Sequence, residues 1–71
     1  MNFRKQIIYI ARKSKELYLE VELFNLQKLS LKQKPCLYFE VYKSDDCKEE
    51  FLVYEEWESE ESYKENEKTK A

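Results

Sequence analysis

The chain contains no glycine and no histidine, and only one proline and two cysteines, among its 71 residues. Without glycine it cannot form the glycine-rich loops that bind nucleotide phosphates, so P-loop and dinucleotide-binding mechanisms are excluded. Without histidine it cannot supply the base of a Ser-His-Asp or Cys-His site. The enzyme classes that remain use carboxylates, Tyr, Trp, Arg or Lys, or depend on chemistry carried mainly by the substrate.

The two cysteines, Cys36 and Cys47, indicate neither a metal site nor a disulfide framework. In a chain without histidine they cannot complete a zinc-type ligand set. Two cysteines allow one bridge at most, and nothing else in the sequence indicates secretion. No neighbouring basic cluster favours activation of either thiol. We therefore expect two free thiols and no metal.

The short length predicts a single domain over residues 1–71 that needs help to be stable. A chain of this size buries only about 60% of the surface that its unfolded form exposes. Because disulfides and metals are disfavoured, association with a second copy is the expected source of stability. Aromatic residues make up 15% of the chain, which argues against a disordered protein.

Charge is divided unevenly along the chain. Residues 1–35 carry a net charge of +5 and residues 36–71 carry −7. We interpret this division as two differently solvated surfaces, with pairing of opposite ends between copies as the alternative. The scattered basic residues and the acidic total do not favour nucleic-acid binding. The longest apolar run, residues 7–11, is too short for a membrane span or a secretory signal, so a cytoplasmic protein is expected.

The first half of the sequence predicts a strand followed by a helix. The run over residues 5–12 has apolar side chains on both faces, which favours a central or doubly covered strand. From Ser14 or Lys15 to about Lys32 we predict a helix capped by Ser14 and ended by Pro35. One face of this helix carries Leu19, Leu23, Leu26 and Ser30, and the opposite face carries Leu17, Val21, Phe24 and Leu31. The first face should pack on a sheet, and the second should meet a partner or lie partly exposed.

The second half predicts a β-hairpin and a short helix. Residues 36–43 alternate, with Leu37, Phe39 and Val41 on one face and Tyr38, Glu40 and Tyr42 on the other. A polar turn over residues 44–48 leads to the return strand over residues 51–57, and Ser59 is placed to cap a second helix anchored by Tyr63. The tail from Asn66 onward is polar and is expected to fray. The order β-α-β-β-α predicts an α+β protein, namely a ferredoxin-like unit whose two helices cover one face of an antiparallel sheet.

Two stretches, Pro35–Tyr42 (PCLYFEVY) and Phe51–Ser62 (FLVYEEWESEES), resemble the antibiotic biosynthesis monooxygenase family. The most specific element is the Glu-x-Trp segment after the hairpin, Glu55-Glu56-Trp57, and the likeness extends over roughly residues 5–68. The resemblance implies a ferredoxin-like fold that pairs sheet to sheet into a dimeric α/β barrel. It therefore implies a homodimer.

The sequence departs from this family at identifiable positions. Ser14 and Pro35 stand where the family has glycines. Relatives usually continue into a fourth strand, so we expect the final strand to be missing from this chain. Positions that carry the chemistry in heme-degrading relatives are occupied here by Ile7 and Asn66, and the histidine of those relatives would lie beyond Ala71. Heme degradation is therefore disfavoured.

The resemblance implies a small cofactor-independent monooxygenase-like protein acting on a quinol or other aromatic substrate in a pocket between sheet and helices. A non-catalytic dimeric module for assembly or small-ligand binding is the alternative, and an acidic-surface interaction domain is a weaker one. The candidate pocket residues are Tyr38, Glu40, Tyr54, Trp57, Tyr63 and Asn66. For each of them an ordinary role in packing or strand pairing is the favoured interpretation, and the sequence identifies no catalytic residue.

Overall fold

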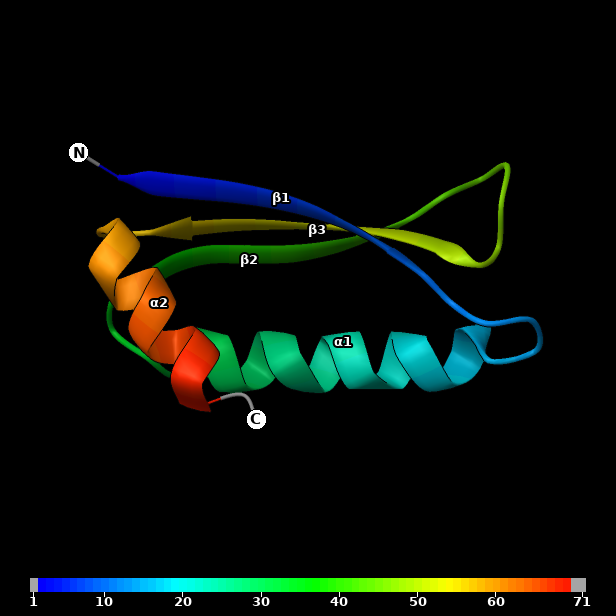
Figure 1. Cartoon of the computed structure of the whole chain (residues 1–71), viewed down its shortest axis with the longest axis horizontal. Coiled ribbons are helices and arrows are strands. Elements are labelled where there is room, and N and C mark those ends of the chain that lie inside the picture. The colour runs from blue at the N-terminus through cyan, green and yellow to red at the C-terminus, as the bar shows by residue number, and fades with distance from the viewer. Residues whose placement is uncertain (1, 70–71) are drawn as a thin grey trace.

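The computed structural model describes residues 2–69 and contains the five predicted elements in the predicted order (Figure 1). These are the strand β1 (Phe3–Ile10), the helix α1 (Glu16–Leu31), the strands β2 (Cys36–Lys43) and β3 (Glu50–Trp57), and the helix α2 (Glu60–Thr69). The α+β class, the hairpin and both helices are confirmed. The limits of α1 agree with the predicted ones to within about two residues, as is usual at helix ends, while α2 continues past the predicted start of the tail to Thr69.

The sheet is antiparallel throughout and has the order β1-β3-β2. The central strand is β3, which pairs with β1 over residues 50–57 and with β2 over residues 51–57. The prediction that the first strand is central or doubly covered is wrong for the described residues, because β1 has a neighbour on one side only. Its outward-facing Ile8 and Ile10 are accordingly 62% and 72% exposed. Apolar side chains on both faces of β1 therefore did not reveal how many strands flank it.

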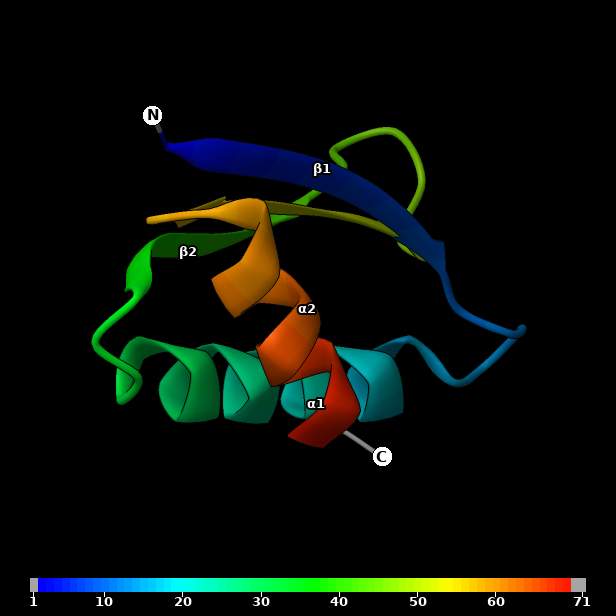
Figure 2. The same cartoon turned by 60° about the vertical axis from the view of Figure 1, so that its left-hand side comes forward.

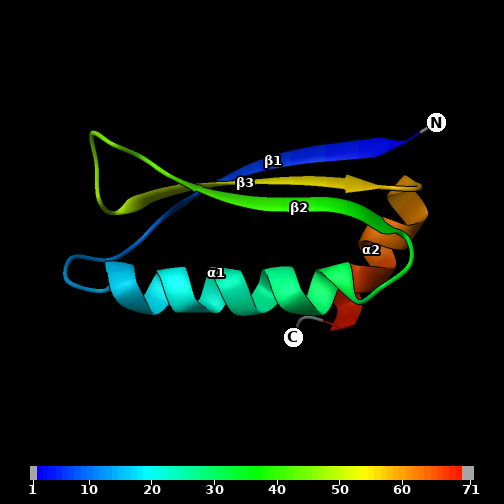
Figure 3. The ribbon, with the colours of Figure 1, turned by 180° about the vertical axis from the view of Figure 1, so that it is seen from behind.

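Both helices cover the same face of the sheet, as predicted (Figure 2). α1 runs along the length of the strands, while α2 crosses near the end where β3 finishes (Figure 1). The predicted inward stripe of α1 is confirmed, because Leu23 and Ser30 are buried and Leu19 and Leu26 pack against the core. In the view from behind, α1 again lies below the strands and no helix lies above them (Figure 3).

The start of α1 differs from the prediction. Ser14 has φ of 68°, in the left-handed region, and Lys15 takes the N-cap position without a side-chain cap hydrogen bond. The backbone amide of Lys15 donates to the carbonyl of Arg12 at 2.9 Å, and this hydrogen bond closes a tight turn that contains Ser14. Ser14 therefore serves the turn and does not cap the helix. This is one of the two positions where the resembled family has glycine, the residue that adopts positive φ without steric cost.

A β-bulge changes the face of one residue on β2. The register shifts between Cys36 and Tyr38, so that Leu37 has no partner of its own on β3. Cys36 is buried beside Phe39, while Leu37 is exposed. The prediction that Leu37 shares the face of Phe39 and Val41 is wrong, because simple alternation does not reveal an extra residue in a strand.

At α2 the predicted cap is confirmed and the predicted fraying is not. The amide of Ser62 donates to the hydroxyl of Ser59 at 3.1 Å, which is the expected capping contact. Asn66 lies inside α2 and is buried, although the sequence predicted a frayed tail from this residue onward. Residues 70–71 of that predicted tail lie outside the described residues. The sequence predicted exposure because asparagine is polar. The contact of α2 with the end of α1 buries Asn66, and this contact is not visible in the sequence.

The core contains a buried polar contact on the central strand. Trp57 Nε1 donates to Glu55 Oε1 at 2.9 Å, and both side chains are fully buried. They lie two residues apart on the helix-covered face of β3, together with Phe51 and Val53. Because a buried carboxylate requires hydrogen-bond partners, the indole both fills the core and satisfies one oxygen of Glu55.

Replacement of Ser14 by glycine should stabilise the protein. Removal of the Cβ at φ 68° relieves a steric cost of about 1–2 kcal/mol, partly offset by the greater freedom of glycine in the unfolded chain. We expect Ser14→Gly to raise the free energy of unfolding by about 0.5–1 kcal/mol in urea titrations. Ser14→Ala, which keeps a Cβ, is the matched control and should show no such gain. Equal stability of the two variants would contradict the interpretation.

The contact between Trp57 and Glu55 should be visible as an energetic coupling. Trp57→Phe should lower the free energy of unfolding by about 2–3 kcal/mol, because it leaves Glu55 Oε1 without this donor and removes buried volume. In a Glu55→Leu background the same substitution should cost about 1–2 kcal/mol less. Glu55→Gln keeps an acceptor and serves as the control background. Strict additivity in the Glu55→Leu background would show that the two residues are not coupled.

Candidate functional site

The six residues suggested by the sequence lie on opposite sides of the sheet. Because β2 and β3 alternate in register, Tyr38, Glu40 and Tyr54 share the helix-free face. The other three, Trp57, Tyr63 and Asn66, lie on the helix-covered side, on β3 and α2. The structure thus brings the residues together in two groups of three. No single pocket can contain all six.

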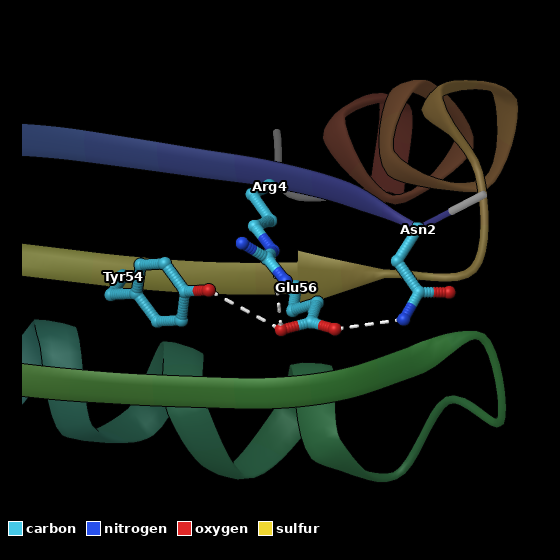
Figure 4. Close-up of polar contacts among 4 residues, drawn as sticks. All are labelled: Asn2, Arg4, Tyr54 and Glu56. Carbon is cyan, nitrogen blue, oxygen red and sulfur yellow. Dashed lines mark hydrogen bonds and ion pairs between the residues drawn. The ribbon is translucent and has the colours of Figure 1, made fainter.

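The helix-free face carries a network around Glu56 (Figure 4). Its carboxylate accepts from Asn2 Nδ2 at 2.8 Å and from the hydroxyl of Tyr54 at 3.2 Å, and Arg4 Nε lies 3.8 Å away. The ring of Tyr54 meets that of Tyr38 edge to face, with centroids 5.6 Å apart. Glu40 lies opposite Tyr54 in the register of β2 and β3. These contacts tie an open sheet surface together and leave Glu56 engaged with neighbouring side chains.

On the helix-covered side, Tyr63 joins α2 to the sheet through aromatic contacts. Its ring centroid lies 5.2 Å from that of Phe3 and 6.3 Å from that of Trp57. Lys5 Nζ lies 5.7 Å from the centroid of the same ring, in cation-π geometry. Tyr63 is therefore the apolar anchor of α2 that the sequence predicted, and Trp57 is the core residue beneath it.

Two tyrosines on this side hold their protons more tightly than usual. Burial, followed by the negative charges of Glu67 and Glu55 and a hydrogen bond with Glu67, raises the pKa of Tyr63 to about 12. Burial, followed by Glu55 and Glu67, also raises the pKa of Tyr9 above 10. Both phenols therefore remain protonated at neutral pH. Both are poorly suited to act as bases, and Tyr9, which lines the pocket described below, can donate a hydrogen bond to a ligand oxygen.

A pocket of about 480 Å³ lies between α1, α2 and β1. Its volume falls within the range of about 300–1,000 Å³ that is typical of small-molecule sites. Its lining is mainly apolar and consists of Tyr9, Leu19, Glu22, Leu23, Asn25, Leu26, Leu29, Ser30, Gln33 and Asn66. Of the six residues suggested by the sequence, only Asn66 is among them.

The polar lining of this pocket centres on Ser30. Ser30 is fully buried in α1, and its hydroxyl makes no hydrogen bond to any residue in the described part of the chain. Nearby on the same pocket wall, Gln33 Nε2 donates to Asn66 Oδ1, which connects the end of α1 to α2. The sequence placed Ser30 only on the packing stripe of the helix. The signal that distinguishes it is a hydroxyl among leucines, on a face that otherwise carries no polar group.

The arrangement suits an apolar ligand that carries an oxygen. The leucines of α1 form the walls, while the hydroxyls of Ser30 and Tyr9 and the amides of Gln33 and Asn66 provide polar groups. Protonated hydroxyl donors in a site shielded from water stabilise developing negative charge on such an oxygen. Glu22, the carboxylate among the lining residues, is exposed at the mouth of the pocket. Tyr9 was missed by sequence reasoning because the alternation of β1 marks it only as a helix-facing strand residue.

Within residues 2–69, no three or more His, Cys, Asp or Glu side chains lie close enough together to hold a metal ion. Neither described helix has the length and apolar character needed to cross a membrane.

Two solved structures share this fold. One is a conserved protein of unknown function from Bacteroides thetaiotaomicron, described as a possible oxidoreductase, with a TM-score of 0.88 and 19% identity over 94% of this chain. The other is a candidate antibiotic biosynthesis monooxygenase from Bordetella bronchiseptica, with a TM-score of 0.70 and 12% identity over 83% of this chain. The aligned regions span 71% and 60% of those two chains. No curated protein matches this chain significantly.

The family comparison covers almost the whole sequence. The model of the antibiotic biosynthesis monooxygenase family matches residues 7–71, which include the pocket, the hairpin and the Glu55-Glu56-Trp57 segment that carried the resemblance. The two structural neighbours agree with the ferredoxin-like arrangement of strands and helices. This chain therefore belongs to the antibiotic biosynthesis monooxygenase family.

Proposed function

We propose that the protein is a small cofactor-independent monooxygenase that oxidises a quinol or other aromatic substrate in the pocket between α1, α2 and β1. The hydroxyl of Ser30 is the observation that carries this proposal, because it is buried on the pocket wall without a hydrogen-bond partner in the described chain. Burial of an unsatisfied hydroxyl is unfavourable unless something bonds to it. A substrate oxygen would supply that bond where entry of the substrate uncovers Ser30, which has no solvent-exposed surface in the free chain.

Such a substrate can react with dioxygen once it is deprotonated. The hydroxy-anthracene tautomer of an anthrone is an example. The hydroxyl proton of the substrate passes to the exposed carboxylate of Glu22 or to water, and the hydroxyls of Ser30 and Tyr9 then donate to the resulting oxyanion. The ring carbon then forms a bond to dioxygen, which is reduced to a hydroperoxide. Loss of water breaks the O–O bond and leaves a carbonyl, so that one oxygen atom enters the product and the other leaves as water.

The same proposal includes a homodimer formed through the helix-free sheet face. In register across the three strands, Ile8, Leu52 and Tyr42 make an apolar row on this face. Ile8 and Tyr42 are exposed in the single chain, and a chain of this size gains stability from covering such a row. Residues 1–71 would act as one cytoplasmic domain in each subunit, without a cofactor.

A non-catalytic dimeric module for assembly or small-ligand binding is the second candidate. It is favoured by the exposure of Glu22, because the lining residues then include no buried carboxylate that could take the proton of a substrate. In this case the pocket would bind an aromatic ligand without turning it over. The two candidates share the ligand class and differ in the consumption of dioxygen.

Oxygen uptake with a panel of hydroquinones and anthrones distinguishes these functions. The protein should consume dioxygen above the protein-free rate with at least one substrate, and Ser30→Ala should lower that rate about tenfold or more. The same substitution should leave the free energy of unfolding unchanged or slightly higher, because it removes an unsatisfied buried hydroxyl. A lower rate of oxygen uptake in Ser30→Ala with no loss of folding stability would show that Ser30 acts on the substrate and does not merely pack in the core.

Ser44→Ala provides the matched control for this measurement. The hydroxyl of Ser44 accepts from the amides of Asp46 and Cys47 in the hairpin turn, and Ser44 is not among the residues that line the pocket. Its removal should leave oxygen uptake unchanged. No uptake above the protein-free rate with any substrate, while the aromatic ligands still bind, would reject the monooxygenase and support the non-catalytic module.

Association through the sheet face should depend on Ile8. Ile8→Lys places a charge in the apolar row of the proposed interface and should raise the dissociation constant of that interface about a hundredfold. Ile8→Val keeps the row apolar and should behave like the unmodified chain. Sedimentation equilibrium at micromolar concentration measures both. Unchanged mass in Ile8→Lys would argue against pairing through this face.

A further inference from the structure

Ser30 is closed off from solvent in the free chain. It lines the pocket between α1, α2 and β1, yet its exposed surface is 0%. A ligand oxygen therefore meets the Ser30 hydroxyl only after a neighbouring group has moved aside. The group that moves controls entry to the site.

A hydrogen bond between two amide side chains lies beside Ser30. Gln33 Nε2 donates to Asn66 Oδ1, and both residues line the same pocket as Ser30. The backbone amide of Gln33 also donates to the carbonyl of Ser30 at 3.0 Å, which forms a tight turn at the end of α1. Side chains three residues apart in such a turn lie on the same side. The amide bridge, as we call this contact of Gln33 with Asn66, is therefore next to the Ser30 side chain.

The apolar neighbours of Ser30 are held in the core and cannot move aside separately. Leu26 and Leu23 lie one and two turns earlier on the same face of α1. Leu23 belongs to the buried core cluster, and Leu26 packs against it. Displacement of either leucine would expose apolar surface to water, which is unfavourable. The leucine side of Ser30 therefore stays closed while the protein is folded.

Gln33 is the polar neighbour that is able to move. It follows the end of α1 at Leu31 and is partly exposed, whereas its partner Asn66 is 2% exposed. A hydrogen bond between neutral side chains contributes little net free energy, because water competes for both groups. Rotation of the Gln33 side chain toward solvent breaks the amide bridge and leaves the apolar core untouched.

The path of α2 makes the amide bridge a local contact. Near its start, α2 is held on the sheet by the ring of Tyr63, which contacts Phe3 and Trp57. Its later part runs away from the sheet to α1, where Asn66 meets Gln33 (Figures 1 and 2). Opening of the bridge therefore leaves the contact of α2 with the sheet intact.

We propose that the amide bridge is a gate, and that outward rotation of Gln33 uncovers the Ser30 hydroxyl and admits a ligand oxygen. This gate rests on the proposed function, because it controls entry of the same ligand class to the same pocket. Gln33 takes no part in the chemistry, and it sets how often Ser30 is open to a ligand. With the bridge closed, water is excluded from Ser30, the condition under which a hydroxyl donor stabilises negative charge most strongly.

Labelling of a thiol at position 30 tests the gate without a ligand. Ser30→Cys is introduced into a Cys47→Ser chain, where the remaining Cys36 is buried, and its reaction with a small aromatic disulfide reagent is followed. The same chain without Ser30→Cys gives the background rate. At low urea the labelling rate should be nearly independent of urea, because a local opening exposes little surface. A dependence as steep as that of global unfolding at every urea concentration would overturn the proposal.

Removal of the Gln33 amide should hold the gate open. Gln33→Ala should raise the labelling rate of Ser30→Cys about tenfold, because the bridge no longer competes with the open state. Gln27→Ala is the matched control, since Gln27 Nε2 donates to the carbonyl of Phe39 at 2.7 Å and Gln27 is not among the residues that line the pocket. It should leave the rate at low urea within about twofold. Equal labelling rates in the two variants would overturn the gate.

Ligand kinetics separate the gate from the proposed function. In chains that keep Ser30, association of a hydroxyanthraquinone should be faster in Gln33→Ala than in Gln27→Ala, by the same factor as the labelling, because the open state is more populated. Equal association rates would count against the gate. If no chain binds this ligand or consumes dioxygen, the proposed function fails, while the labelling rates at position 30 still support or overturn the gate.

Discussion

The inward row of β3 is the constraint on which the rest of the structure depends. Phe51, Val53, Glu55 and Trp57 are all buried, and their strand pairs with both other strands of the sheet. Because Glu55 is a carboxylate inside an apolar core, the indole of Trp57 must face it and donate at 2.9 Å. That orientation places Trp57 beneath Tyr63, which fixes where α2 crosses the sheet and hence where the pocket closes.

The pocket depends on the same anchor. With α2 held by Tyr63, its next buried residue, Asn66, reaches Gln33 at the end of α1. Ser30 lies within the same lining, and Tyr9 contributes from β1 a phenol whose proton is held by burial and by nearby carboxylates. Elements distant in sequence thus supply donors around one mainly apolar space. This is the reason that an oxygen-bearing aromatic molecule is the ligand class we propose.

Most of the exposed large apolar residues of the single chain lie on two separate surfaces. One is the helix-free face of the sheet, which carries Ile8 on the edge strand, and the other is the outward stripe of α1, which carries Val21. A small domain cannot cover both with its own residues, since its surface is large relative to its volume. Association through either surface would leave the pocket unaltered, because the pocket lies between these two surfaces.

The sequence by itself determined the order of the elements, the inward stripe of α1 and the cap at Ser59, because periodicity and capping are local properties of the chain. It did not predict the bulge at Leu37 or the positive φ of Ser14, since both depend on strand register and a tight turn. The candidate site was predicted only in part. Aromatic residue type suggested Tyr54 and Trp57 as pocket residues, but successive side chains of β3 point to opposite faces of the sheet, so these two residues lie on different sides. Only the tertiary structure brought Ser30 and Asn66 to one pocket, because helix packing alone determines which polar side chains from distant segments are buried together.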